Sequence, residues 1–277
     1  MKEIGINDLP KYSPWVNRLL GLEPFNQVAR NIEKIDSEYD KDKYAKLLSY
    51  YESGHNCEDV RRLERFSGRE SSCISIRGKL YLAANSETGT LMDRLLVNTL
   101  SKPLLGVDKI IELGAGYGYN LHLLGNKYPG KIWIGGEYSP NAVSLASRLL
   151  HNHKFVVPFN FYDDSWSIFD MVEDGKKALV FTCHAIEQLP LVCQALQTLG
   201  KYKNKISEVI YLEPVYELID KSTTLGLMRQ SYTRLNDYNT DLLSALKAMD
   251  VEVLQTEYDL LGISPLNPTS LIRWKFH

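Results

Sequence analysis

The first hundred residues carry their apolar side chains mainly at helical spacing. Apolar residues recur at i, i+3, i+4 and i+7 over residues 44–51, and a similar spacing runs over residues 28–35, so each stretch predicts a short helix. Apolar and polar residues instead alternate over residues 73–84, which predicts a hairpin around Gly78. A longer helix is expected over residues 87–100.

A different pattern begins at Lys109, where short apolar runs alternate with amphipathic segments. Ser139-Pro140 marks the start of one helix, because serine can cap free amides and proline suits the first turn. Leu189-Pro190 marks the start of a second helix, which Gly200 ends, and a third is expected over residues 239–249. The predicted strands are residues 109–113, 132–136, 155–161, 178–182, 208–212, 251–258 and 271–276.

The order of these elements predicts the fold class. Strands that alternate with helices pair in parallel, because each helix returns the chain to the same end of the sheet. The last two strands are joined only by residues 259–270, a short connection containing Pro265 and Pro268, which favours an antiparallel hairpin. We therefore expect an α/β fold with a seven-stranded doubly wound sheet, mostly parallel with an antiparallel last strand, over residues 105–277. Residues 1–104 would form a mainly helical N-terminal lid or substrate region.

Composition excludes some partners. The 277 residues are 44% hydrophobic, and the net charge is −2. Nucleic acid is not expected as a partner, because binding a phosphate backbone usually needs a surplus of Lys and Arg. No membrane span is expected, since no apolar run approaches about 18 residues. The N-terminus lacks a signal-peptide pattern and the four cysteines are scattered, which favours a cytoplasmic protein, either a monomer or a homodimer.

The segment ELGAGYG, residues 112–118, is the strongest chemical signal in the chain. An apolar strand leads directly into Gly114, Gly116 and Gly118, which allow a sharp turn and a close approach to a ligand. A dinucleotide site has the spacing G-x-G-x-x-G, but here the third glycine comes one residue early and Tyr119 stands at the last position. This spacing disfavours a pyrophosphate-binding turn.

Two acids flank the turn. Glu112, at the end of the first strand, would repel a phosphate but suits the ammonium group of an amino acid. Glu137, at the end of the second strand, suits both hydroxyls of a ribose. Together they indicate S-adenosylmethionine, which carries an ammonium group, a ribose and no phosphate.

The segments ELGAGYG, at residues 112–118, and GEYS, at residues 136–139, resemble the first two motifs of the class I S-adenosylmethionine-dependent methyltransferases, in particular their small-molecule branch. The resemblance covers residues 105–277 and implies a Rossmann-like sheet whose strand ends hold the cofactor, with S-adenosylhomocysteine as product. It also implies adenine contacts after the third strand, from Tyr162 and from either Asp163 or Asp164. The expected cofactor-binding residues are Glu112, Gly114, Ala115, Gly116, Gly118, Glu137, Tyr138, Tyr162, Asp163, Asp164 and Cys183.

The reaction centre is expected after the fourth strand, around Cys183-His184. His184 is the candidate general base, because an imidazole accepts a proton near neutral pH. A role in binding the cofactor or capping the next helix is an equal alternative. The family often has an acid and a histidine here in another order, with a histidine where this chain has Gln188.

The acceptor is expected to contact residues at the ends of later strands. Glu187 and Glu213 would give a negative pocket that suits a cationic or hydroxyl-rich molecule, and Tyr216 would add an aromatic face. Asn236 belongs to a polar segment, residues 229–239, that is expected to form a loop. No divalent metal is expected, since the Asp and Asp-Asn ligands of metal-dependent relatives are absent from these strand ends.

The predicted function is therefore metal-independent methyl transfer from S-adenosylmethionine to an oxygen or nitrogen of a small molecule. The N-terminal helices would close over the crevice as a lid, with tyrosines that face the substrate or only pack the lid. A peptide or protein side chain is an alternative acceptor. A non-catalytic nucleotide-binding protein, or an NAD-dependent Rossmann protein, is the alternative of another class.

Overall fold

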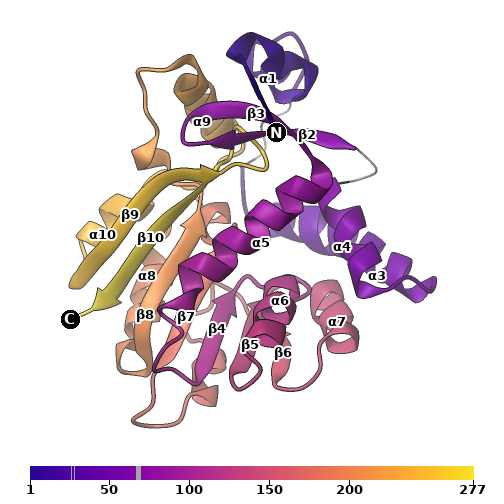
Figure 1. Ribbon diagram of the computed structural model, residues 1–277. Helices are drawn as coiled ribbons and strands as arrows, with labels where there is room; N and C mark the ends of the chain where they lie inside the picture. The colour runs from indigo at the N-terminus through magenta and orange to yellow at the C-terminus, as the bar shows by residue number, and fades with distance from the viewer. Residues whose placement is uncertain (26, 28, 67–69) are drawn as a thin grey trace.

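The computed structural model describes residues 1–25, 27, 29–66 and 70–277 (Figure 1). Val28, in the helix expected over residues 28–35, lies outside the described residues. The helices are α1 (Trp15–Leu19), α2 (Ile32–Ile35), α3 (Ala45–Glu52), α4 (Cys57–Phe66), α5 (Asn85–Ser101), α6 (Tyr119–Lys127), α7 (Pro140–Leu149), α8 (Cys193–Gly200), α9 (Thr224–Leu235) and α10 (Leu242–Lys247). The strands are β1 (Lys2–Ile4), β2 (Ser71–Ile76), β3 (Lys79–Ala84), β4 (Lys109–Leu113), β5 (Ile132–Glu137), β6 (Lys154–Pro158), β7 (Ala178–Cys183), β8 (Ile206–Glu213), β9 (Val251–Leu261) and β10 (Thr269–Phe276).

The central sheet has seven strands in the order β6-β5-β4-β7-β8-β10-β9. The first five strands pair in parallel, and β10 runs antiparallel to both β8 and β9. The predicted fold class is therefore confirmed, including the reversed last strand. All seven expected strands are present, with ends that differ from the prediction by a few residues.

Helices cover both faces of this sheet (Figure 1). One face is covered by α5, α6 and α7, which place Leu96, Leu121 and Ala146 against Ile110 and Phe181 of the strands. The other face is covered by α8 and α10, which pack against the opposite side chains of the same strands. Helix α5 thus packs on the sheet, although the expected boundary at residue 104 assigned it to the N-terminal region.

The N-terminal region contains a second sheet, of three strands in the order β1-β3-β2. The expected hairpin around Gly78 forms β2 and β3. Ser75 of β2 exchanges backbone hydrogen bonds with Gly262, just beyond β9, at 2.9 and 2.8 Å. This contact brings the small sheet against the end of the large one that carries the loop between β9 and β10.

The expected polar loop over residues 229–239 was a wrong prediction for its first half. Residues up to Leu235 continue helix α9, and the Arg229 side chain is only 2% exposed. Its guanidinium pairs with buried Asp259 at 2.9 Å and donates to the Pro265 carbonyl at 2.8 Å. Arg229 is polar but not a loop residue, because its buried guanidinium holds the β9–β10 connection.

Two helices begin later than predicted. Leu189 is extended, as residues before proline usually are, and α8 starts only at Cys193. Asn239 does not begin its helix but caps it, because its side-chain oxygen accepts from the Leu242 amide at 2.9 Å.

Candidate active site

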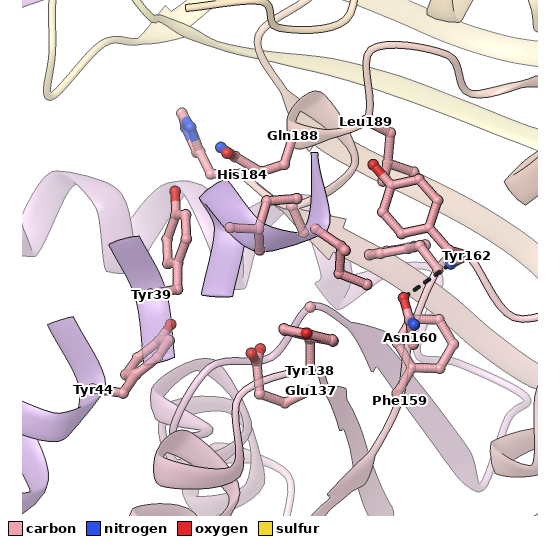
Figure 2. Close-up of a pocket in the computed structure, with 15 residues that line it drawn as sticks. Tyr39, Tyr44, Glu137, Tyr138, Phe159, Asn160, Tyr162, His184, Gln188 and Leu189 are labelled. Atoms are coloured by element: carbon pink, nitrogen blue, oxygen red, sulfur yellow. Dashed lines mark hydrogen bonds between the residues drawn. The ribbon is translucent and has the colours of Figure 1, made fainter. Parts of the chain in front are cut away.

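Two adjoining cavities lie at the carboxyl ends of β4, β5 and β7. The first has a volume of about 660 Å³ and the second about 1260 Å³. Tyr39, Tyr44, Gly114 and His184 line both, so the two cavities meet at these four residues. Figure 2 shows the first cavity, with Tyr39 and Tyr44 on one side and Tyr162 and Asn160 on the other.

The glycine-rich turn lies where the two cavities meet. Gly114 has a φ of +78° and Gly116 a φ of +55°, so both adopt the left-handed conformation that favours glycine. A side-chain carbon at Gly114 would lie 2.3 Å from Cβ of Ala185, and one at Gly116 would lie 2.5 Å from the Tyr44 hydroxyl. The turn is therefore packed closely between the loop after β7 and the N-terminal segment.

The two predicted acids lie at the ends of β4 and β5. The Glu112 side chain is 1% exposed, and its Oε1 accepts from Asn120 Nδ2 at 2.6 Å. Its Oε2 has no hydrogen-bond partner among the described residues, and the residue lines the second cavity. Burial, together with the charges of Glu137 and Glu213, raises the pKa of Glu112 to about 8.

Glu137 borders the first cavity and also holds the turn. Its carboxylate accepts from the backbone amides of Gly116 at 2.7 Å and Ser139 at 2.9 Å. Burial raises the pKa of Glu137, while these amide hydrogen bonds oppose the shift. Tyr138 follows it and lines the same cavity. The structure therefore brings Glu112, the glycines and Glu137 together in the arrangement expected from the sequence.

The segment after β6 forms the wall opposite the N-terminal tyrosines. Phe159, Asn160 and Tyr162 line the first cavity (Figure 2). Asp163 and Asp164, the expected adenine partners, are exposed and are not among the residues that line the described cavities. Sequence reasoning missed Asn160, although it directly precedes the aromatic pair that marked this segment.

The N-terminal segment forms one side of both cavities. Residues Asp36–Tyr44 are π-helical, and Asp40 accepts hydrogen bonds from the Ser139 hydroxyl at 2.5 Å and the Asn141 amide at 2.9 Å. These bonds attach the segment to the start of α7. Tyr39, Lys43 and Tyr44 of this segment reach the cavities. The two tyrosines belong to those expected either to face the substrate or only to pack the lid, whereas Lys43 was not expected at the site.

Lys43 is the only lysine or arginine among the described residues that line the two cavities. Its ammonium lies 2.7 Å from Glu64 and about 5 to 6 Å from the ring centres of Tyr44 and Tyr39. Burial lowers the pKa of Lys43, but Glu64, Tyr44 and Tyr39 together outweigh this effect and raise the pKa overall. Lys43 is thus held as a cation beside the glycine-rich turn.

His184 follows β7 and lines both cavities, as expected for a residue at the reaction centre. Its φ of +54° is unusual for a residue other than glycine, and such backbone strain often occurs at functional sites. Its Nε2 lies 2.7 Å from the Thr269 hydroxyl, and its Nδ1 lies 3.5 Å from Glu187 Oε1. Burial lowers the pKa of His184, but the Glu187 and Glu213 carboxylates raise it overall.

Glu187 lies on the far side of His184, with its side chain only 5% exposed. Its two carboxylate oxygens accept from Gln188 Nε2 at 2.9 Å and Asn267 Nδ2 at 3.0 Å. It lines the second cavity and also a narrow adjoining pocket, called the small pocket below. Glu187 therefore faces the space beyond the glycine turn, where an acceptor was expected.

Glu213 has a different environment from the other acids. It is fully buried and accepts from the backbone amides of Ala185, at 3.0 Å, and Ile186 and Glu187, each at 3.4 Å. Burial and the charge of Glu187 raise its pKa to about 7. This arrangement favours a role in holding the loop that carries His184 over direct contact with an acceptor.

The remaining expected residues are dispersed. Cys183 and Ala115 line the second cavity, and Tyr216 lines the small pocket. The Arg234 guanidinium lies 5.5 Å from the ring centre of Tyr216, but Arg234 is not among the residues that line the pocket. Asn236 donates to the Tyr232 carbonyl at the end of α9 and is not among the residues lining the described cavities. The positions of Tyr216 and Cys183 are compatible with their expected roles.

Among the described residues, no group of three or more His, Cys, Asp or Glu side chains is arranged to hold a metal ion. Within the same part of the chain, no helix combines the length and apolar character that a bilayer crossing requires.

Neither a protein-family model nor a curated protein sequence matches the chain. Among solved structures, it is similar to the mitomycin 7-O-methyltransferase MmcR, with 11% identity and a TM-score of 0.50 over 96% of this chain and 69% of that one. It is also similar to the plantazolicin methyltransferase BpumL, solved with a triazolic desmethylPZN analogue and S-adenosylhomocysteine, with 14% identity and a TM-score of 0.46 over 88% and 99%. The chain therefore has the Rossmann-like fold of the class I S-adenosylmethionine-dependent methyltransferases.

Proposed function

We propose that the protein is an S-adenosylmethionine-dependent methyltransferase that acts on a small molecule. The observation that carries the proposal is the arrangement around the glycine turn, where buried Glu112 presents an unpartnered oxygen and Glu137 stands at the end of the next strand. An ammonium group would satisfy the first carboxylate, and ribose hydroxyls would suit the second. The likeness to MmcR, an O-methyltransferase by name, supports the same class of reaction.

The rest of the two cavities fits the other parts of the cofactor. The first is bounded by Phe159, Tyr162 and Leu189, and its apolar walls suit an adenine ring, whose edge Asn160 would hydrogen-bond. Lys43 would pair with the carboxylate of the methionine moiety, because that carboxylate needs a cation when it is buried.

We further propose that the reaction needs no metal ion, because a sulfonium supplies a methyl group that is already activated. The protein would then contribute binding, orientation and the removal of a proton. Of the residues lining both cavities, His184 is the candidate base, since its imidazole lies where the cavities meet. The segment Asp36–Tyr44 would exclude water from this point.

Titration of the purified protein with S-adenosylmethionine and with NAD tests the proposal. We expect micromolar binding of S-adenosylmethionine alone, and a Glu137→Ala change is expected to weaken it about 100-fold through loss of the ribose contacts and of the turn. Glu252→Ala is the matched control, because this exposed carboxylate pairs with Lys275 on β10, far from the turn. Binding of NAD without binding of S-adenosylmethionine would show that the proposal is wrong.

A further inference from the structure

The Glu187 carboxylate is fixed at the boundary between the second cavity and the small pocket. Gln188 and Asn267 each donate to one of its oxygens. Its backbone is also held, because the Glu187 carbonyl accepts from the Asn239 amide at 2.9 Å and the Glu187 amide donates to Glu213. A buried carboxylate with so little freedom is preorganised to bind a group that enters either space.

Further oxygens around Glu187 lack partners. A carboxylate only accepts hydrogen bonds, so the amide groups of Gln188 and Asn267 must turn their NH₂ groups toward Glu187 and their oxygens away from it. Both amide oxygens are buried, and neither has a hydrogen-bond partner in the described part of the chain. Asn267 is 9% exposed and lines both the second cavity and the small pocket. The hydroxyl of Tyr216, in the small pocket, is likewise buried without a described partner.

The charge and the apolar side chains around Glu187 limit the chemical class of ligand that can bind there. The small pocket has no Lys, Arg or His among its described lining residues, while Glu187 contributes a carboxylate. Tyr238 lines the pocket and the second cavity, and Val215, Ile219 and Leu266 make the pocket largely apolar. An occupant should therefore carry hydrogen-bond donors and a positive charge at one end and an apolar group at the other.

We propose that the methyl acceptor is an amine that binds in the second cavity as an ammonium ion, held by Glu187 and Asn267. This proposal rests on the proposed methyltransferase function and specifies which acceptor it uses. Besides the Glu187 carboxylate, the Asn267 amide oxygen lines the same cavity without a partner among the described residues and would accept a second N–H of the ammonium, whereas an alcohol has only one donor.

The same geometry explains how the amine becomes a nucleophile. His184 Nδ1 is 3.5 Å from Glu187 Oε1, so an ammonium held by Glu187 lies beside the imidazole. The ammonium transfers one proton to His184 Nδ1, and the freed nitrogen lone pair forms a bond to the methyl carbon. The carbon–sulfur bond breaks as this bond forms, and its electron pair stays on sulfur as the sulfonium becomes a thioether. The methylated ammonium leaves, and His184 returns its proton to water.

A matched pair of ligands tests the proposal on protein saturated with S-adenosylhomocysteine. 2-Phenylethylamine and 2-phenylethanol differ mainly in the charged group, and calorimetry or ligand-detected NMR can compare them at up to 10 mM, a concentration set by the weak binding of ligands this small. We expect the amine to bind at least about tenfold more tightly. Glu187→Gln should remove most of this preference while leaving the alcohol and S-adenosylhomocysteine within about threefold. Glu217→Gln is the matched control, because Glu217 caps α10 and does not line these cavities.

The outcomes separate the two proposals. If wild-type protein binds no S-adenosylhomocysteine, the methyltransferase function itself fails. If the cofactor product binds but the alcohol binds as well as the amine, or neither binds, the amine proposal is wrong. If Glu187→Gln does not fold, Asn267→Ala provides the second test, with an expected loss of about threefold for the amine and no change for the alcohol.

Discussion

The cofactor half and the acceptor half of the site are built in different ways. The cofactor half, from Glu112 to Glu137, comes from one continuous β-α-β unit, and its main contacts involve backbone amides and glycines. The acceptor half brings together Glu187, Tyr238 and Asn267, which belong to three separate connections. Its geometry depends on how whole elements pack, including the buried Arg229 network that holds the loop around Asn267.

This difference indicates where each kind of specificity resides. A ligand recognised by backbone conformation needs a short segment with set torsion angles, and many side-chain changes around it are tolerated. Where side chains from several connections converge on a ligand, a change in any one connection can change which ligand the site binds. Apart from its glycines and the side chains of Glu112, Glu137 and Lys43, the cofactor half would therefore tolerate substitutions that the acceptor half would not.

The largest expected effect comes from Gly114→Ala. The new methyl group would lie 2.3 Å from Cβ of Ala185, at a φ of +78°. We expect at least a 100-fold loss of S-adenosylmethionine affinity by calorimetry. Gly106→Ala is the matched control, because Gly106 has a similar φ of +90° but open space around it. It should cost about 1 kcal/mol of stability without weakening binding. Equal losses of affinity in both variants would show that the turn is not a specific cradle.

His184→Asn is expected to have the next largest effect. Asparagine tolerates the left-handed backbone at this position, so the change removes the imidazole with little added strain. Turnover should fall about 100-fold, the usual contribution of a general base, while the affinity for S-adenosylhomocysteine stays within threefold. Because its carboxylate neighbours raise the pKa of His184, wild-type turnover should fall as the pH drops and His184 becomes protonated. A variant that keeps the wild-type rate and pH profile would reduce His184 to a packing role.

The same difference explains what the sequence could predict. The strands of the central sheet and the antiparallel β10 followed from apolar periodicity and connection length, because both are local properties. Glu112, the glycines and Glu137 were found for the same reason. Helix α9 was missed because Arg229 and Gln230 resemble surface residues in sequence, and only the packed structure shows that Arg229 pairs with buried Asp259.

The acceptor half could not be assembled from the sequence. No sequence pattern indicates that Asn267 contacts Glu187, because the two residues are 80 positions apart. In the cofactor half, likewise, no pattern indicates that Lys43 lies beside the glycine turn. Asn267 belongs to the connection over residues 259–270, which the sequence predicts only as a short link between the last two strands. Of the residues expected to contact adenine, Tyr162 lines the first cavity, whereas Asp163 and Asp164 are exposed.

Lys43→Met offers a smaller and sharper test, because it removes a charge that reaches the cofactor half from the N-terminal segment. We expect S-adenosylmethionine affinity to fall about 30-fold, while the affinity for decarboxylated S-adenosylmethionine, which lacks the carboxylate, changes less than threefold. Lys43→Arg keeps the charge and should retain most of the affinity. Equal losses for both ligands would mean that Lys43 acts by holding the segment, through its contact with Glu64, and not by pairing with the carboxylate.

The smallest expected effect is a dependence of cofactor affinity on pH that originates at Glu112. Its raised pKa, about 8 against an ordinary 4.5, means that the free protein holds this group protonated at neutral pH, beside Glu137 and Glu213. The same shift destabilises the free protein as the pH rises from about 4.5 to 8, because the unfolded chain ionises first. Binding an ammonium requires the carboxylate, so binding near pH 7 must release a proton.

Affinity for S-adenosylmethionine should therefore rise with pH up to about 8, by at most about tenfold per unit, and then fall as the amino group of the ligand loses its own proton. Calorimetry in buffers with different ionisation enthalpies should detect close to one proton released at pH 7 in the wild type and none in Glu112→Gln. If the wild type releases no proton, Glu112 is already ionised or does not meet the ammonium. Cofactor binding would then depend on the glycine turn, Glu137 and Lys43, without Glu112. The Glu112 carboxylate would matter less for cofactor binding than the Glu187 carboxylate matters for acceptor binding.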